Sequence, residues 1–182
     1  MTYGTHPFGS ATYGGSVADF KVSFNIDKTI DDQPMIAVSD LVDKALIEHF
    51  NRYPEELQFM DRRRFEVLVA ELFKGYGYEV ELTQRTRDGG KDIIAIRHHI
   101  VSEKFIVECK RPDPQNKVGV RAVRELIGVK DIENATKAIL VTTAYFSHDA
   151  QVLLDRHKWE VEGKDYIALK SWIEQYLKLG LQ

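Results

Sequence analysis

The residues of this sequence that could do chemistry are two acids and a lysine near the middle of the chain: Asp92, Glu108 and Lys110. Carboxylate oxygens suit Mg²⁺, which neutralises phosphate charge and lowers the pKa of a bound water. An ammonium beside the ion can orient that water, help to deprotonate it, or balance transition-state charge. The combination indicates metal-dependent phosphodiester hydrolysis. An isolated Glu-x-Lys is also typical of an ordinary salt bridge at a sheet edge, so the triplet alone leaves that alternative open.

The segments around these residues are predicted to form a β-hairpin. Residues 92–97 and 104–111 alternate as strands, and pairing around a turn near Ile100 would set Asp92 opposite Glu108. Since side chains alternate along a strand, Glu108 and Lys110 share one face. Cys109 then points to the other face, which favours a core position over a role as nucleophile. Burying three charged groups is costly unless a metal ion and a phosphate pair with them.

The remaining patterns predict an α/β domain whose helices cover a mixed sheet. Asp61 is placed to cap a helix with apolar residues at helical spacing, and Gly75 and Gly77 are placed to end it. Ser147 is placed to cap a later helix. The other predicted elements are strands at 78–83, 138–143 and 159–161 and helices at 118–129 and 165–177. Trp159, Trp172 and Tyr176 are predicted to be core or helix-packing aromatics.

The first 60 residues have a different character. Residues 1–20 are predicted to be a flexible tail, because residues 1–18 contain no Lys, Arg, Asp or Glu. Residues 21–60 are predicted to form a small extension, with a strand at 21–26 and a helix after Ser39 whose apolar stripe is Leu41, Val42, Ala45, Leu46 and Phe50. Pro54 is expected to interrupt the chain there. The main domain is predicted to span residues 61–182.

Several motifs occur together and in order within residues 61–177. They are Phe65-Glu66, Gly77-Tyr78-Glu79-Val80, Thr86-Arg87-Asp88-Gly89-Gly90-Lys91-Asp92-Ile93, Val107-Glu108-Cys109-Lys110-Arg111 and Val118-Gly119-Val120. This set resembles the Mrr-like branch of the restriction-endonuclease superfamily, the PD-(D/E)xK group of metal-dependent nucleases. The resemblance implies a restriction-endonuclease-like three-layer fold. Lys91 stands where the group's name has proline, and Glu108 stands where some Mrr relatives carry Gln.

The resemblance also implies roles for individual residues. Asp92 and Glu108 would bind Mg²⁺, for which Mn²⁺ would substitute, and Lys110 would be the catalytic lysine. Glu66 would be an auxiliary acid near the metal. We also place the backbone carbonyl of Cys109 among the metal ligands. Histidine and cysteine spacing predicts no zinc site.

Basic residues predict where DNA would bind. The net charge is −3, yet residues 61–130 carry 15 Lys and Arg against 11 Asp and Glu, whereas residues 1–60 carry 4 against 9. Lys117, Arg121 and Arg124 follow i, i+4, i+7 spacing, which would place them on one helix stripe for phosphate contacts. A solvated helix face is the alternative. Arg111, Gly89 and Gly90 complete the predicted DNA-binding set.

The expected function is an Mg²⁺-dependent endonuclease acting on double-stranded DNA in restriction of foreign or modified DNA. A DNA-repair or junction-processing nuclease, and a non-cleaving DNA-binding or partner-binding module, are the alternatives. A homodimer is expected, since duplex cleavage by single-site enzymes usually needs two copies. A single cysteine, no long apolar run and no secretory leader predict a cytoplasmic protein without a membrane span.

Overall fold

A five-stranded mixed sheet organises the residues that the computed structural model describes, 44–83 and 91–179. Its strands are β1 (Glu79–Leu82), β2 (Ile93–His98), β3 (Ser102–Lys110), β4 (Lys137–Thr142) and β5 (Val161–Lys164). The helices are α1 (Lys44–Arg52), the 3₁₀ helix η1 (Pro54–Phe59), α2 (Arg62–Gly75), α3 (Val120–Ile132), α4 (His148–Arg156) and α5 (Tyr166–Leu179). These residues all belong to one compact unit, 34–182.

The strands lie in the sheet in their order along the chain. β1, β2 and β3 are antiparallel, whereas β3, β4 and β5 are parallel. In the β2–β3 hairpin Ile93 pairs with Val107 and Ile96 with Lys104. The predicted hairpin register is therefore confirmed as far as Ile93 and Val107, and Asp92 and Glu108 each lie one residue beyond that pair.

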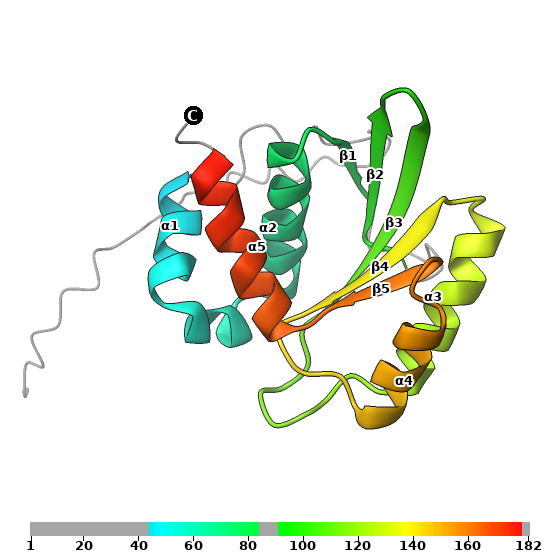
Figure 1. The fold of residues 1–182 in the computed structure, drawn as a ribbon. Coiled ribbons are helices and arrows are strands. Elements are labelled where there is room, and N and C mark those ends of the chain that lie inside the picture. Colours follow the sequence, from blue (N-terminus) through cyan, green and yellow to red (C-terminus); the bar gives the residue numbers. More distant parts are fainter. Residues whose placement is uncertain (1–43, 84–90, 180–182) are drawn as a thin grey trace, which may run out of the picture. The chain divides into compact units, whose positions relative to one another are not determined.

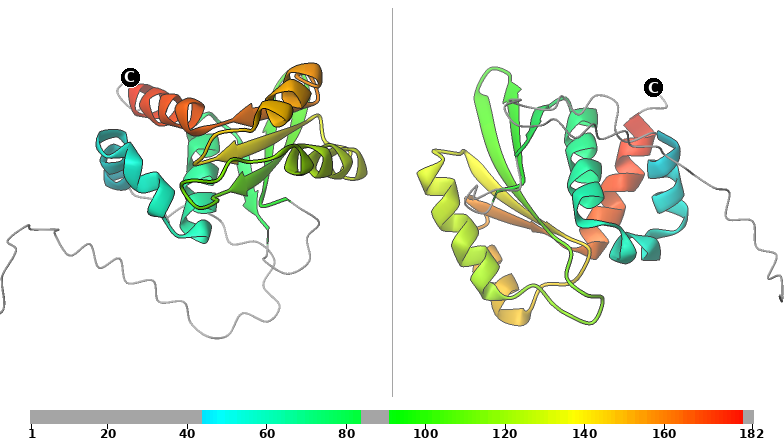
Figure 2. Two further views of the ribbon diagram at one scale, coloured as in Figure 1. Left: turned by 90° about the horizontal axis from the view of Figure 1, so that it is seen from below. Right: turned by 180° about the vertical axis from the view of Figure 1, so that it is seen from behind.

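Helices cover both faces of the sheet, so the predicted three-layer α/β fold is confirmed (Figure 1). One core holds buried side chains of α1, η1, α2 and α5 and includes Val107 of β3. The other lies under α3 and α4 and includes Ile106. Figure 2 shows the two helical layers on opposite sides of the strands. Neighbouring residues of β3 thus face different cores, as strand alternation requires.

The helix boundaries predicted from capping residues are confirmed. Asp61 accepts hydrogen bonds from the backbone N–H groups of Arg63 and Arg64, and Ser147 accepts one from Ala150. Helix α2 ends at Gly75, and Gly77 follows with a φ of 82°, a left-handed conformation that favours glycine.

Helix α1 differs from its prediction. Phe50 is buried and Leu46 is partly buried against the same core, as predicted, but Ile47 is buried and Ala45 is exposed, contrary to the prediction. Leu41 and Val42 lie outside the described residues. The buried side of α1 is set by its packing against α5, which local periodicity does not report. After α1, Pro54 begins η1, whose Leu57 is fully buried in the same core as α2.

Two other expectations concern residues outside the two cores. Trp159 was expected to be buried, but its exposed fraction is 82%, because β5 begins only at Val161 and leaves Trp159 in the preceding turn. The predicted tail at 1–20, strand at 21–26 and helix cap at Ser39 lie outside the described residues.

Within residues 44–83 and 91–179, no helix is both long and apolar enough to cross a membrane.

Candidate active site

Asp92 lies at the open end of the β2–β3 hairpin, one residue before β2. Its backbone N–H donates to Val107 O at 2.8 Å, and its carbonyl accepts from Thr83 N at 3.0 Å, so both neighbouring strands fix its main chain. Cys109 N donates to the side-chain oxygen Asp92 Oδ2 at 2.7 Å. The carboxylate therefore accepts a hydrogen bond that a backbone carbonyl would accept if the ladder of the hairpin continued. The carboxylate orientation is therefore set by the hairpin ladder itself.

Glu108 and Lys110 point from β3 to the face covered by α3 and α4, the face of Ile106. The Glu108 side chain is buried, with an exposed fraction of 5% for the residue. Lys110 Nζ lies 2.5 Å from Glu108 Oε1. Within the described residues Glu108 Oε2 is buried and has no hydrogen-bond partner. A buried carboxylate oxygen without a partner is costly unless a ligand supplies one.

Burial dominates the electrostatics of both acids. It raises the pKa of Asp92 above its ordinary value, although the Cys109 N–H, Lys110 and Arg63 act in the opposite direction. Burial also raises the pKa of Glu108 despite its bond to Lys110, and the nearby Asp92 charge raises it further. Two carboxylates held together in this way repel each other and favour a cation between them.

Lys110 is held as an ammonium. Burial lowers its pKa, but the hydrogen bond that it donates to Glu108 and the charges of Glu108 and Asp92 outweigh burial and raise it above the ordinary lysine value. Its side chain is 43% exposed, so the ammonium is accessible from solvent. An accessible ammonium beside two acids is suited to hold a phosphate or orient a water.

Glu66 occupies a separate position on α2. It is buried, and Arg63 Nη1 donates to Glu66 Oε2 at 2.8 Å and to Thr83 O at 3.1 Å. Because Thr83 also binds the backbone of Asp92, Arg63 links the start of α2 to the end of the hairpin. The charge of Glu66 contributes to a raised pKa of the Cys109 thiol, so Glu66 lies close to that thiol.

The carboxylate oxygens of Asp92 and Glu108 are suited to bind a hard cation such as Mg²⁺. Both are oxygen ligands with raised pKa values, and Oε2 of Glu108 lacks a partner within the described residues. In that same part of the chain, no group of three or more His, Cys, Asp or Glu side chains is arranged to hold a metal ion. A cation there would therefore take its other ligands from water, backbone or substrate.

The Cys109 side chain lies on the face opposite Glu108, packed against the core of α2 and α5, as expected. Burial raises the pKa of its thiol well above the ordinary value, and Asp92, Glu66 and Glu108 raise it further. A thiol that stays protonated is a poor nucleophile. Its carbonyl as a metal ligand stays a prediction.

The predicted DNA-binding residues are only partly brought together. Helix α3 begins at Val120 after the N-cap Gly119, so Lys117 precedes the helix and the predicted three-residue stripe was wrong. Arg121 and Arg124 are exposed on α3, and Arg121 Nε pairs with Glu125 Oε1 at 2.7 Å. The helix starts later because Val118 forms a β-bridge with Phe146.

Arg111 and the glycines complete the predicted set. Arg111 donates to Gln58 O of η1 at 2.9 Å, so it helps to hold η1 against the end of β3. Gly89 and Gly90 lie outside the described residues.

Two residues near the site were missed by the sequence reasoning. Arg63 was not among the predicted site residues, yet it bonds to Glu66 and acts to lower the pKa of Asp92. Glu125 was not considered, yet its charge contributes to raising the pKa values of Glu108 and Lys110. The i, i+3 spacing of Arg63 and Glu66 was a usable signal for their ion pair. Nothing local in the sequence places Glu125 beside β3.

Comparison with known proteins identifies the class. The family model Mrr_cat, described as "Restriction endonuclease", matches residues 57–173. The uncharacterized protein y4cE of Sinorhizobium fredii is 30% identical over 129 residues, 69% of this chain and 32% of that protein. The DNA modification-dependent restriction endonuclease AspBHI has a TM-score of 0.53 at 20% identity, over 83% of this chain and 43% of that one.

A further solved structure, the MspJI restriction endonuclease in complex with a 27-mer oligonucleotide, has a TM-score of 0.49 at 16% identity, over 75% of this chain and 32% of that one. Fold and family together define a nuclease domain of the restriction-endonuclease class. This chain belongs to the restriction endonuclease family of the Mrr catalytic domain. It spans about a third of the length of the curated relative that it matches.

Proposed function

We propose that this protein is a metal-dependent endonuclease that hydrolyses phosphodiester bonds of double-stranded DNA. The observation that carries the proposal is the pair of buried carboxylates, Asp92 and Glu108, beside the Lys110 ammonium, with Glu108 Oε2 lacking a partner among the described residues. Such a site stores unfavourable electrostatic energy that a divalent cation and a phosphate would relieve. Membership of a restriction endonuclease family supports the same reaction.

In this mechanism Asp92 and Glu108 would hold Mg²⁺, with the Cys109 carbonyl as a further ligand, and Mn²⁺ would substitute. The bound ion would neutralise phosphate charge and lower the pKa of a coordinated water. Lys110 orients the attacking water and offsets the negative charge that builds up on the phosphate. A water that has given up a proton to solvent would bond through its oxygen to phosphorus, while the bond to the leaving sugar oxygen breaks and that oxygen takes up a proton from solvent. The Cys109 N–H keeps the Asp92 carboxylate in position throughout.

Restriction of foreign or modified DNA is the setting that we propose. The related fold of AspBHI belongs to an enzyme described as DNA modification-dependent, and the curated relative is about three times longer than the matched region. Other parts of a longer protein could therefore select the DNA, while the domain described here cleaves it. Cutting both strands would use two copies of the site, so we propose a homodimer on DNA.

The test is cleavage of methylated and unmethylated plasmid with Mg²⁺, Mn²⁺ or EDTA, comparing the parent protein with Asp92→Asn. We expect nicking or linearisation only with a divalent metal and an intact Asp92. Branched and linear duplexes, tested side by side, separate a junction-processing enzyme from a restriction enzyme. Binding of DNA without cleavage under every metal condition would support a non-cleaving module instead.

Glu66→Gln is expected to weaken cleavage more at low Mg²⁺ than at high Mg²⁺. The buried Glu66 carboxylate contributes negative charge near Cys109, whose N–H holds the Asp92 carboxylate, and Gln removes that charge at constant size. Mg²⁺ titrations of the initial cleavage rate measure the effect. Glu71→Gln on the same helix is the matched control, because Glu71 accepts from Tyr176 OH of α5. An equal loss at every Mg²⁺ concentration would assign Glu66 a structural role.

Replacing Arg121 and Arg124 of α3 with alanine is expected to weaken binding to every DNA sequence by a similar factor. Both are exposed, and an exposed ion pair such as Arg121–Glu125 is weak enough for a phosphate to displace. Each lost phosphate contact should flatten the slope of log affinity against log salt by about 0.9. A salt titration of binding in Ca²⁺ measures the slope.

The control for this measurement removes the same charge elsewhere, at Lys44 and Arg52 of α1, which are also exposed. We expect their replacement by alanine to leave the slope near the parent value. If the slopes of the two double variants are the same, α3 does not contact DNA.

A further inference from the structure

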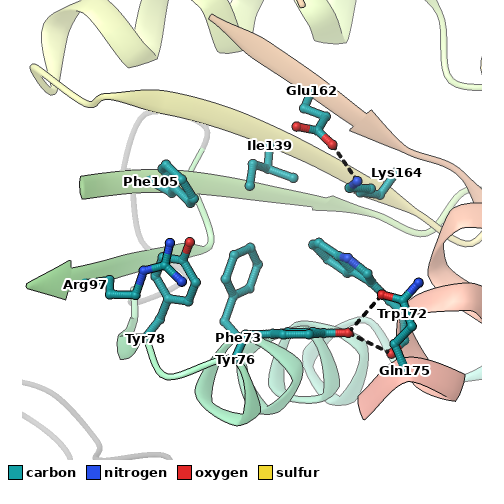
Figure 3. A pocket seen from close by; sticks show the side chains of 10 residues that line it. All are labelled: Phe73, Tyr76, Tyr78, Arg97, Phe105, Ile139, Glu162, Lys164, Trp172 and Gln175. Atoms are coloured by element: carbon teal, nitrogen blue, oxygen red, sulfur yellow. Dashed lines mark hydrogen bonds and ion pairs between the residues drawn. The ribbon is translucent and has the colours of Figure 1, made fainter. Parts of the chain in front are cut away.

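A second cavity lies on the other face of the sheet, away from Asp92, Glu108 and Lys110. It has a volume of about 240 Å³ and lies between α2, α5 and the sheet (Figure 3). Phe105 of β3 lines it, on the face of Val107 and Cys109 and opposite that of Glu108. No residue assigned above to cleavage or DNA contact lines this cavity.

Aromatic rings form its floor and two walls. Figure 3 shows Phe73 between Tyr78 on one side and Trp172 on the other. The Phe73 ring is edge-on to both, at centroid distances of 5.5 Å and 5.3 Å. Tyr78 also packs against Phe105 at 5.4 Å. Phe73 is buried, whereas the rings of Tyr78, Phe105 and Trp172 are only partly buried, so the walls offer apolar surface to a ligand.

The rim of the cavity carries hydrogen-bond donors and acceptors together. Arg97 lies over the Tyr78 ring at 4.5 Å and donates to Glu103 at 2.8 Å. Its Nε is buried and has no hydrogen-bond partner within the described residues. Lys164 lies 5.2 Å from the Trp172 centroid and is 2.5 Å from Glu162.

The exposed end of α5 adds an amide to this rim. Tyr76 OH donates to Gln175 Oε1 at 3.4 Å, and both residues line the cavity. The amide of Gln175 can also donate, so the rim contains a cation, a carboxylate, a hydroxyl and an amide around one aromatic floor. A ligand that matches this lining is planar, with apolar faces and an edge that both donates and accepts.

We propose that this aromatic pocket binds a nucleobase. A base stacks on aromatic rings through its faces and presents donors and acceptors along its edge. A phenylalanine side chain from a protein partner would fill the walls but make no hydrogen bonds to the rim residues Arg97, Lys164 and Gln175. The cavity is smaller than the roughly 300–1,000 Å³ of sites for drug-sized ligands, which agrees with a single ring system.

The base could come from a free nucleotide or from an unpaired position of a DNA strand. The chemistry of recognition is the same in both cases: stacking on the aromatic walls and bonding to the rim. The inference goes beyond the proposed cleavage reaction and does not depend on it, because the two sites lie on opposite faces of the sheet.

Trp172 provides a local reporter of binding. The chain has two tryptophans, and Trp159 is 82% exposed, so Trp159→Phe leaves Trp172 as the single fluorophore with little effect on packing. AMP and CMP are titrated into this variant of the full chain in EDTA, with ribose 5-phosphate as the ligand without a base. We expect saturable quenching of Trp172 by the two nucleotides and none by ribose 5-phosphate.

Two variants of the pocket test where the base sits. Phe105→Leu removes a stacking wall and should weaken nucleotide binding about tenfold, as expected for loss of one base–aromatic stack. Gln175→Ala changes an exposed residue that folding does not require and should weaken binding several-fold. Gln151→Ala, at an exposed glutamine of α4, is the matched control and should bind as the parent does.

The source of the base is distinguished by oligonucleotides. Quenching by a single strand, in competition with AMP and absent for the same sequence as a duplex, identifies an unpaired strand base. Quenching by AMP or CMP alone identifies a free nucleotide, and either result supports the proposal. Equal quenching by ribose 5-phosphate, quenching only by N-acetylphenylalanine amide, or no response to any nucleotide overturns it.

Discussion

Lys110→Ala is expected to reduce the cleavage rate by at least about 10²–10³-fold, the usual cost of removing one group that stabilises transition-state charge. Lys110 is 43% exposed and bonds only to Glu108 among the contacts described above, so its loss should leave the cores intact. Affinity for DNA measured in Ca²⁺ should change little, because the ammonium acts mainly on charge that develops during the reaction.

The measurement is initial plasmid nicking at saturating protein, with circular dichroism to verify folding. Lys104→Ala is the matched control: Lys104 lies on the same strand, but its ammonium donates to Glu133 O at 2.8 Å, away from the acids. It should nick at the parent rate. Full activity of a folded Lys110→Ala protein would remove Lys110 from the mechanism.

Glu108→Gln is expected to abolish cleavage and, in EDTA, to stabilise the fold. The folded protein raises the pKa of Glu108, mainly through burial, so the ionised carboxylate is less favourable folded than unfolded. The ionised Glu108 therefore lowers the stability of the fold fully at a pH above its pKa in the folded protein. This loss of stability disappears as the pH falls to the ordinary glutamate pKa. At neutral pH, replacing Glu108 with Gln removes this destabilisation. A gain of about 1 kcal/mol would raise Tm by about 2–4 °C.

Thermal unfolding with EDTA and with Mg²⁺ measures both parts of this prediction. The parent protein should gain Tm on adding Mg²⁺ by mass action, whereas Glu108→Gln should lose most of that gain. Glu103→Gln, on the same strand and paired with Arg97, is the control and should not be stabilised in EDTA. A lower Tm for Glu108→Gln in EDTA would show that its bond to Lys110 outweighs the cost of burial.

The register of the β2–β3 hairpin could be predicted from the local sequence pattern. Alternation of apolar residues and the position of the turn predicted that Asp92 lies opposite Glu108, and the observed pairing of Ile93 with Val107 confirms the register. Register is strongly determined there because a shift of one residue would exchange the two faces of both strands. The caps at Asp61 and Ser147 were equally predictable, since a capping side chain bonds within three residues of itself.

The structure differs from the sequence predictions where contacts between distant segments determine the local structure. Lys117 was expected on α3, but the bridge between Val118 and Phe146 delays the helix to Val120. The buried side of α1 follows from its packing against α5, which joins segments more than a hundred residues apart. Trp159 was assigned to the core from its residue type, and the position of β5 leaves it exposed.

The sequence by itself determined the kind of site, because Asp92, Glu108 and Lys110 lie within one hairpin whose geometry follows from strand periodicity. Only the tertiary structure decided the surroundings of that site. Arg63 reaches Thr83 because α2 packs at the end of the sheet, and Glu125 approaches Glu108 because α3 covers the other face. The aromatic pocket likewise exists only where α2 and α5 meet the sheet, since burial between distant segments has no local signature.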